Sequence, residues 1–154
     1  MTCSMPRMIL YSVALAALAA CRGPDTPKAA DSSAVPATSA PLILVVGTSL
    51  TAGLGLDPSE AYPAVLQEKI DSAGLEYLVV NRGVSGETSA GALQRVDWLM
   101  RQRVAVLILE TGANDGLRGL DPDSLRSNID AIVKRARRQA PPPSILLLLS
   151  LIHI

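Results

Sequence analysis

Residues 42–148 are predicted to form a three-layer α/β/α domain, with helices covering both faces of a parallel sheet. Short continuous apolar segments alternate along this region with segments whose apolar residues recur at helical spacing. Continuous apolar runs are typical of strands that a parallel sheet buries on both faces. The repeated order of strand and helix implies parallel strands joined by right-handed crossovers.

The first half of the domain contains two predicted strands with a helix between them. The uninterrupted apolar run at 42–46 predicts the first strand. A helix is predicted over 62–73, because Pro63 suits a first helical turn and Gly74 is placed to end the helix. The segment 77–81, which reads Tyr-Leu-Val-Val-Asn, predicts the second strand.

The second half repeats this order. Thr88 or Ser89 can cap a helix whose apolar residues continue to Met100. The run at 104–110 predicts a third buried strand. An Asp-Pro pair opens a helix predicted over 121–139, since aspartate is a preferred cap and proline suits the first helical position. The prolines at 141–143 stop this helix, and 144–148 opens a fourth strand.

The composition of the 154 residues excludes several classes of protein. The 14 basic and 14 acidic side chains balance, which argues against a nucleic-acid binder, because such proteins usually show a basic excess. The two cysteines stand at positions 3 and 21, so a disulfide scaffold and a cysteine-rich metal site are excluded. No cofactor is expected. The single histidine, His153, is the second-to-last residue.

The N-terminal segment has the pattern of an export signal. A basic start, a short apolar stretch and a small-residue end predict a signal peptide over 1–20, and the apolar stretch at 8–20 is too short to span a membrane. Leu18-Ala19-Ala20-Cys21 resembles the lipobox of bacterial lipoproteins, in which the cysteine is acylated. Arg22 replaces the aspartate associated with inner-membrane retention, which favours the outer membrane. An ordinary signal peptide with an incidental cysteine is the alternative.

The segment 21–41 is predicted to be a lipid-anchored flexible linker. It is rich in Ala, Pro, Ser, Thr and Asp, and Val35 is its one sizeable apolar side chain before the domain begins. Such a segment buries too little apolar surface to offset the entropy lost on ordering. The domain would therefore stand off the periplasmic face of a membrane to which Cys21 is attached.

Small polar residues and glycines follow each of the first three predicted strands. In parallel α/β sheets, functional groups gather outside the carboxyl ends of the strands. Ser49 follows the first strand behind Gly47, and the loop 82–88 contains glycines that allow close approach of backbone N–H groups. Asn114, after the third strand, has a side-chain amide that can donate to a developing negative charge. A hydroxyl and oxyanion donors are what acyl transfer needs, although each loop alone could be an ordinary turn.

These loops do not match several other known motifs. A P-loop is excluded because no lysine occurs between Lys28 and Lys69. Pro58 stands where a dinucleotide fingerprint needs its third glycine, and Thr51 stands where the nucleophile elbow of α/β-hydrolases needs its last glycine.

The three loops together resemble conserved blocks of the SGNH (GDSL) hydrolase family. The branch they are most similar to is the bacterial arylesterase, thioesterase and lysophospholipase group. The resemblance implies a flavodoxin-like parallel sheet and an ester hydrolase without a metal. The matching segments are Gly47-Thr48-Ser49-Leu50, Asn81…Gly83…Ser85-Gly86 and Gly112-Ala113-Asn114-Asp115.

The resemblance also implies a role for each site residue. Ser49 would be the nucleophile, and its own N–H, the N–H of Gly86 and the side-chain amide of Asn114 would form the oxyanion hole. Asp115 would brace its loop, with Gly47, Thr48 and Gly112 as further supporting residues. The family has an aspartate where this chain has Thr48, so the carboxylate is lost and a hydroxyl is kept.

The family's catalytic Asp-x-x-His motif has no match in this sequence. No aspartate follows Asp130, and His153 is interpreted as a chance residue. The tail 149–154 resembles the translation of an adapter used in sequencing libraries, which suggests adapter read-through after Leu148. The hypothesis is a C-terminally truncated hydrolase domain, inactive as a fragment because its Asp and His are missing.

The sequence therefore predicts an exported serine esterase acting on aryl or acyl esters, thioesters or lysophospholipids. Two alternatives stay open. One is a lipid-anchored binding domain of flavodoxin-like fold without catalysis, and the other is a deacetylase of envelope polysaccharides.

Overall fold

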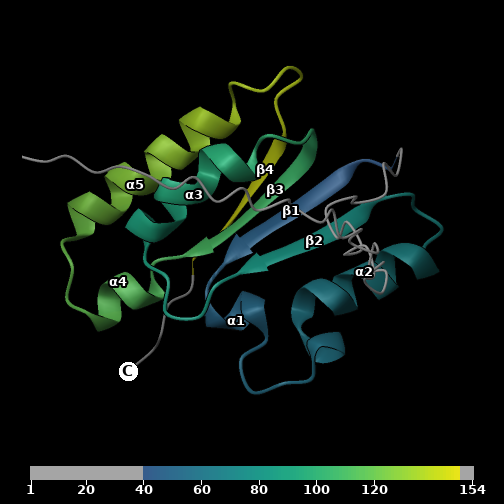
Figure 1. Cartoon of the computed structure of the whole chain (residues 1–154), viewed down its shortest axis with the longest axis horizontal. Helices are drawn as coiled ribbons and strands as arrows, with labels where there is room; N and C mark the ends of the chain where they lie inside the picture. The colour runs from purple at the N-terminus through teal and green to yellow at the C-terminus, as the bar shows by residue number, and fades with distance from the viewer. Residues whose placement is uncertain (1–39, 150–154) are drawn as a thin grey trace, which may run out of the picture. The chain divides into compact units, whose positions relative to one another are not determined.

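A computed structural model of the chain describes residues 40–149 (Figure 1). The predicted signal peptide, Cys21, nearly all of the predicted linker and His153 lie outside the described residues. Within 40–149, no helix has both the length and the apolar character needed to cross a membrane.

The described residues contain one parallel sheet of four strands, as the sequence predicts. The strand order is β2-β1-β3-β4, so β1 lies between β2 and β3. Val45 in the middle of β1 is in register with Asn81 on one side and with Ile108 on the other. The strands are β1 (Leu42–Gly47), β2 (Leu78–Gly83), β3 (Val104–Thr111) and β4 (Ser144–Leu149).

Three long helices cover the two faces of this sheet, which gives the predicted three layers (Figure 1). Helix α2 (Tyr62–Ser72) packs on one face, and α3 (Ser89–Leu99) and α5 (Pro122–Ala136) pack together on the other. Alternate residues of β1 explain this division, since successive side chains of a strand point to opposite faces. Leu44 contributes to the core under α3 and α5, whereas Val45 contributes to the core under α2.

The structure corrects the predicted extents of several elements. Strand β2 begins at Leu78 and continues to Gly83, later than the predicted 77–81 at both ends. Short helices that the sequence does not predict lie between the predicted strands and helices: α1 (Ser49–Ala52), the 3-10 helix η1 (Pro58–Glu60) and α4 (Ala113–Leu117). Helices of three to five residues are too short to show an apolar repeat, so periodicity did not predict them.

Helix α1 packs closely against the carboxyl end of β2. A Cβ atom added to Gly83 would lie 2.3 Å from the Ala52 nitrogen and 2.7 Å from the Thr51 carbonyl carbon. Both atoms belong to the backbone, so neither can move aside as a flexible side chain would. The glycine at 83 is therefore required by the approach of α1.

We expect Gly83→Ala to lower the free energy of unfolding by about 1–3 kcal/mol, the usual cost of overpacking. Urea unfolding followed by circular dichroism measures the change. Gly116→Ala is the matched control, because a Cβ at Gly116 in helix α4 would meet nothing within 4 Å. A Gly83→Ala midpoint equal to that of the control would contradict the predicted clash.

Candidate active site

The loops that follow β1, β2 and β3 meet at one edge of the sheet. Because β1 lies between the other two strands, its carboxyl end is adjacent to both of theirs. The Val84 N–H donates to the Gly47 carbonyl oxygen at 2.8 Å, which joins the β2 loop to the end of β1. Helices α1 and α4 lie at this edge, beyond the strand ends (Figure 1). Functional groups of parallel α/β folds gather at such an edge.

Ser49 is the first residue of α1 and is partly exposed at this edge. Its hydroxyl and its backbone N–H make no hydrogen bond to any of residues 40–149. Thr48 is the residue at the N-cap position, but its side chain does not cap the helix. The Ser49 hydroxyl is thus available for a reaction on the first turn of a helix that directly follows a buried strand.

The Thr48 side chain instead donates to Glu110 at the end of β3. The distances from Thr48 Oγ1 to the two carboxylate oxygens are 2.9 and 3.0 Å, and the Thr48 N–H donates to Glu110 Oε2 at 2.7 Å. Both residues are buried, with exposed fractions of 2% and 4%. An aspartate at 48 would place a second carboxylate against Glu110, whereas the neutral hydroxyl of Thr48 donates a hydrogen bond to it.

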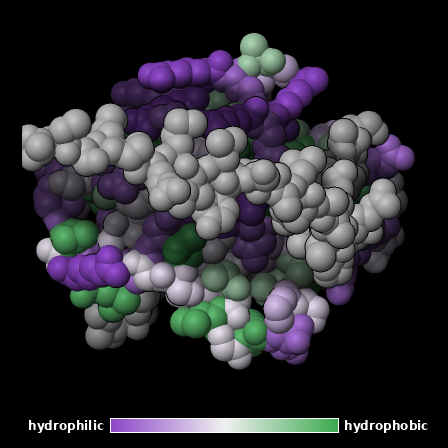
Figure 2. All heavy atoms as spheres, in the orientation of Figure 1, coloured by the Kyte–Doolittle hydropathy of each residue, from purple (hydrophilic) through white to green (hydrophobic). Residues whose placement is uncertain are grey.

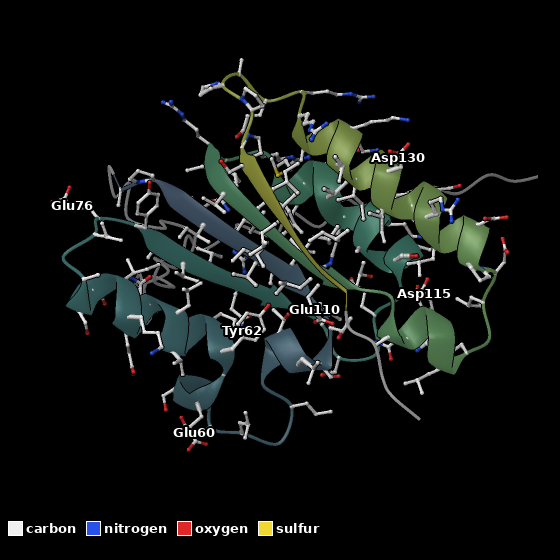
Figure 3. All side chains as sticks on the ribbon, turned by 180° about the vertical axis from the view of Figure 1, so that it is seen from behind. Glu60, Tyr62, Glu76, Glu110, Asp115 and Asp130 are labelled. Carbon is white, nitrogen blue, oxygen red and sulfur yellow. The ribbon has the colours of Figure 1, made fainter. Side chains whose placement is uncertain are left out.

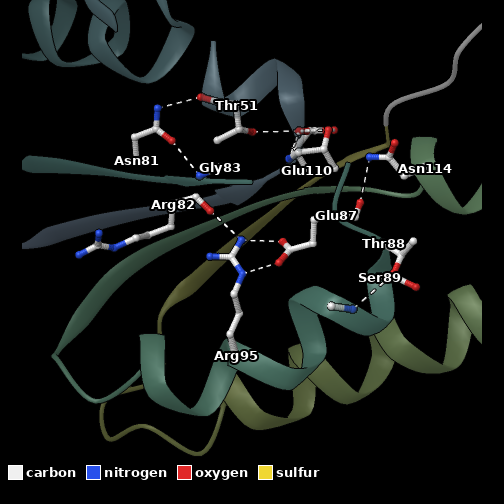
Figure 4. A network of polar contacts seen from close by, with 12 residues as sticks. Thr51, Asn81, Arg82, Gly83, Glu87, Thr88, Ser89, Arg95, Glu110 and Asn114 are labelled. Carbon is white, nitrogen blue, oxygen red and sulfur yellow. Dashed lines mark hydrogen bonds and ion pairs between the residues drawn. The ribbon is translucent and has the colours of Figure 1, made fainter. Parts of the chain in front are cut away.

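A second contact holds α1 from the side of β2. The Asn81 side-chain amide donates to the Thr51 carbonyl oxygen at 2.8 Å, and Asn81 Oδ1 accepts the Gly83 N–H at 2.9 Å (Figure 4). Asn81 thus links the backbone of α1 to the end of β2. Helix α1 is consequently fixed from both neighbouring strands.

Gly86 and Asn114 lie in the loops that follow β2 and β3. Gly86 has a φ of +78°, a conformation that favours glycine, and its N–H makes no hydrogen bond to any described residue. Asn114 Nδ2 donates to the Glu87 carbonyl oxygen at 2.9 Å (Figure 4). An amide nitrogen has two N–H groups, and the second one donates to none of the described residues. The Arg118 guanidinium donates to the Gly86 carbonyl oxygen at 2.8 Å.

An ion pair fixes the loop that carries Gly86. Arg95 Nε and Nη2 donate to the two oxygens of Glu87, each at 2.6 Å, and Nη2 also donates to the Arg82 carbonyl oxygen at 2.7 Å (Figure 4). Bidentate pairs of this kind combine strength with a defined geometry. The nearby Trp98 is 55% exposed, and the Arg82 guanidinium lies 5.8 Å from the centre of its ring.

Asp115 connects the β3 loop to the start of α3. Its carboxylate is 3% exposed and accepts the Ser89 hydroxyl at 2.6 Å and the Ser89 N–H at 2.9 Å. Thr88, not Ser89, caps α3, because the Thr88 side chain accepts the Gly91 N–H. Gly112 precedes α4 with a φ of +104°, again a glycine conformation. The structure therefore places Asp115 and Gly112 in the framework of the loop that holds Asn114.

The structure brings the loops of Ser49, Gly86 and Asn114 to one edge, but residues 40–149 contain no histidine to act as a base. No cluster of three or more potential metal ligands occurs among the described residues. Sequence reasoning assigned no role to Glu110, Thr51 and Arg95. One signal could have indicated Glu110: it is the charged last residue of an otherwise apolar strand prediction. Figure 3 shows Glu110 and Tyr62 near one another at this edge.

A parallel α/β domain with serine, glycine and asparagine in three neighbouring loops at one sheet edge has the arrangement of the SGNH class of proteins. Comparison with known families agrees with this assignment. The chain belongs to the GDSL-like Lipase/Acylhydrolase family, which matches residues 45–153.

Two curated relatives are similar to this chain over much of the described domain. Esterase TesA of Pseudomonas aeruginosa is 43% identical over 98 residues, which cover 63% of this chain and 49% of TesA. The thioesterase 1/protease 1/lysophospholipase L1 of Escherichia coli is 34% identical over 111 residues, covering 71% of this chain and 52% of that protein. The chain thus spans about half the length of these relatives.

Solved structures show the same fold. The esterase AlinE4, described as an SGNH-hydrolase family esterase, is 40% identical and superposes with a TM-score of 0.65, covering 70% of this chain and 58% of AlinE4. The crystal structure of TesA is 42% identical with a TM-score of 0.65, covering 69% of this chain and 58% of TesA.

Proposed function

We propose that the protein is a serine esterase that hydrolyses carboxylic esters or thioesters. The observation that supports this most directly is the Ser49 hydroxyl, which bonds to none of residues 40–149 and lies at the same sheet edge as the Gly86 N–H and the Asn114 amide. The relatives named esterase, arylesterase and thioesterase support the same reaction class.

In the proposed reaction, Ser49 Oγ attacks the acyl carbonyl carbon while its proton passes to a base. The Ser49 N–H, the Gly86 N–H and the Asn114 amide donate to the oxygen that becomes negatively charged. The alcohol or thiol then leaves with a proton, and water releases the acid from the acyl-enzyme. The base is expected to be a histidine of an Asp-x-x-His motif, which the described residues do not contain.

The surface around Ser49 suits an aryl or acyl group. Figure 2 shows hydrophobic atoms gathered along the lower edge of the domain, over α1 and α4. Large exposed apolar side chains occur in and after these two helices: Leu50, Leu54, Leu56, Leu117 and Leu120. An apolar substrate group would remove such side chains from water. Acyl esters, thioesters and lysophospholipids all offer such a group.

We further propose that the protein acts outside the cytoplasm and is anchored to the outer membrane through a lipidated Cys21. The apolar stretch that ends in Leu18-Ala19-Ala20-Cys21 supports export and lipidation. Metabolic labelling with an alkyne-bearing fatty acid tests the anchor. Loss of label in Cys21→Ser is expected, and label retained in that variant would contradict lipidation at Cys21.

A fluorophosphonate probe tests the nucleophile directly. The protein expressed from its complete reading frame is incubated with the probe, the serine oxygen displaces fluoride from phosphorus, and peptide mass spectrometry locates the adduct. We expect one adduct, on Ser49, and hydrolysis of short p-nitrophenyl esters that stops as the adduct forms. An adduct on another serine would contradict the assignment. A folded protein with neither adduct nor hydrolysis would favour the non-catalytic binding domain.

A further inference from the structure

We propose that Glu110 is a positioning residue that holds the nucleophile helix α1 in its reactive place. This inference rests on the proposed role of Ser49 as the nucleophile. Glu110 is the next-to-last residue of β3 and makes no proposed contact with substrate. Glu110 acts on Ser49 through Thr48 and Thr51, which lie on either side of the serine in the sequence.

The Glu110 carboxylate accepts hydrogen bonds from both sides of Ser49. Thr48, one residue before the serine, donates its N–H and its hydroxyl. Thr51, two residues after the serine, donates its hydroxyl to Oε2 at 2.9 Å. Ser49 thus lies between Thr48 and Thr51, and both of these residues are hydrogen-bonded to the one buried carboxylate. Three donors from these two residues therefore converge on one carboxylate, and this attachment restrains α1.

Gly47 leaves the space in which these groups meet. A Cβ atom on Gly47 would lie 1.9 Å from Thr51 Oγ1 and 2.7 Å from Glu110 Oε2. Any other residue at 47 would push apart the hydroxyl and the carboxylate that bond to each other. The absence of a side chain at Gly47 therefore allows the hydrogen bond between Glu110 and Thr51 of α1.

The hydrogen-bonded chain continues from Thr51 to Tyr62 at the start of α2. Thr51 Oγ1 and the Tyr62 hydroxyl are 2.9 Å apart. Because the single hydroxyl proton of Thr51 goes to Glu110, Tyr62 must be the donor to Thr51. Burial raises the pKa of the Tyr62 phenol, the hydrogen bond with Thr51 offsets part of this, and the negative charge of Glu110 raises the pKa as well. The pKa of Tyr62 therefore depends on whether residue 110 carries a negative charge.

Positioning matters because a misplacement of about 1 Å in an attacking group can cost roughly 10²-fold in rate. Substrate binding draws on other groups, such as the apolar side chains around the site. A loosened α1 should consequently reduce kcat and leave KM nearly unchanged. A variant that is only less stable behaves differently, since its folded fraction keeps the full kcat.

The central experiment compares Glu110→Gln with Gln139→Ala in the protein expressed from its complete reading frame. Gln139 also makes several hydrogen bonds to backbone groups, but at the opposite edge of the sheet, where it accepts from Val104 N–H. With p-nitrophenyl butyrate and folded protein, we expect kcat to fall about 10- to 100-fold in Glu110→Gln at similar KM. Gln139→Ala should keep kcat. An unchanged kcat in folded Glu110→Gln would overturn the proposal.

The Thr51 variants keep the test decisive if Glu110→Gln does not fold. Thr51→Ser retains the hydroxyl that donates to Glu110, whereas Thr51→Val retains the shape and removes the hydroxyl. We expect kcat near that of the parent protein in Thr51→Ser and a loss of 10-fold or more in Thr51→Val. Equal kcat values in these two variants would overturn the proposal.

A titration without substrate separates this proposal from the proposed function. NMR of protein with ¹³C-labelled tyrosine rings follows Tyr62, and its signal is assigned with Tyr62→Phe. We expect the pKa of Tyr62 to fall in Glu110→Gln, because a neighbouring negative charge is removed. An unchanged pKa would overturn the proposal. Full turnover in Ser49→Ala would refute the nucleophile assignment, an outcome that the titration does not depend on.

Discussion

Ser49→Ala is expected to reduce ester hydrolysis by roughly 10⁴- to 10⁶-fold, the loss seen when a serine hydrolase loses its nucleophile. The alanine variant lacks the oxygen that attacks the carbonyl, and the other hydroxyl of α1, that of Thr51, is buried and bonded to Glu110 and Tyr62. Steady-state kinetics with short p-nitrophenyl esters measure the loss. Folding should be little affected, because the Ser49 hydroxyl makes no hydrogen bond to the described residues.

Ser59→Ala is the matched control for this substitution. Ser59 is an exposed serine of η1, and its side chain bonds to Asp57. We expect Ser59→Ala to keep the parent turnover. Turnover retained by Ser49→Ala at the level of this control would show that another residue is the nucleophile.

Asn114→Ala is expected to lower kcat by about 10²–10³-fold, the usual effect of removing one oxyanion-hole donor. Because the second amide N–H would donate to charge that develops only in the transition state, KM should change little. Kinetics with p-nitrophenyl esters over a range of concentrations separate kcat from KM.

The matched control for Asn114 is Asn128 in α5. Its side-chain amide also makes one hydrogen bond to a residue of another element, donating to Ser89 Oγ at the start of α3 at 3.0 Å. Asn128→Ala therefore removes a similar contact outside the proposed oxyanion hole. Comparable losses of kcat in both variants would show that Asn114 acts through loop stability alone.

Much of the fold could be predicted because its signals are local. The uninterrupted apolar run at 42–46 predicts β1 almost to its ends, and the Asp121-Pro122 pair marks the start of α5 at the correct residue. A buried strand and a helix cap each depend on a few consecutive residues. The predicted boundaries of the strands were less accurate where the chain turns. The predicted end of β2 fell short of Gly83, because a charged Arg82 and a glycine do not resemble strand residues in the sequence.

The candidate site could be predicted only in part. Ser49, Gly86 and Asn114 each follow a predicted strand, so a general rule for parallel sheets and the family resemblance both point to them. Glu110 was overlooked because a carboxylate at the end of a strand has many possible surroundings. Its partner Thr48 is 62 positions away in the sequence, a separation that no periodic pattern reports.

The sequence by itself determined the alternation of strands and helices, the export-type N-terminal pattern and the residue types that follow each strand. Each of these features depends on residues that are close to one another in the sequence. The tertiary structure alone decided that β1 lies between β2 and β3, and that Thr48 and Thr51 both bond to Glu110. Such contacts join segments brought together by burial of the sheet under α2, α3 and α5. The physical reason is that a buried carboxylate is stable only beside donors, and the packed fold supplies those donors from distant residues.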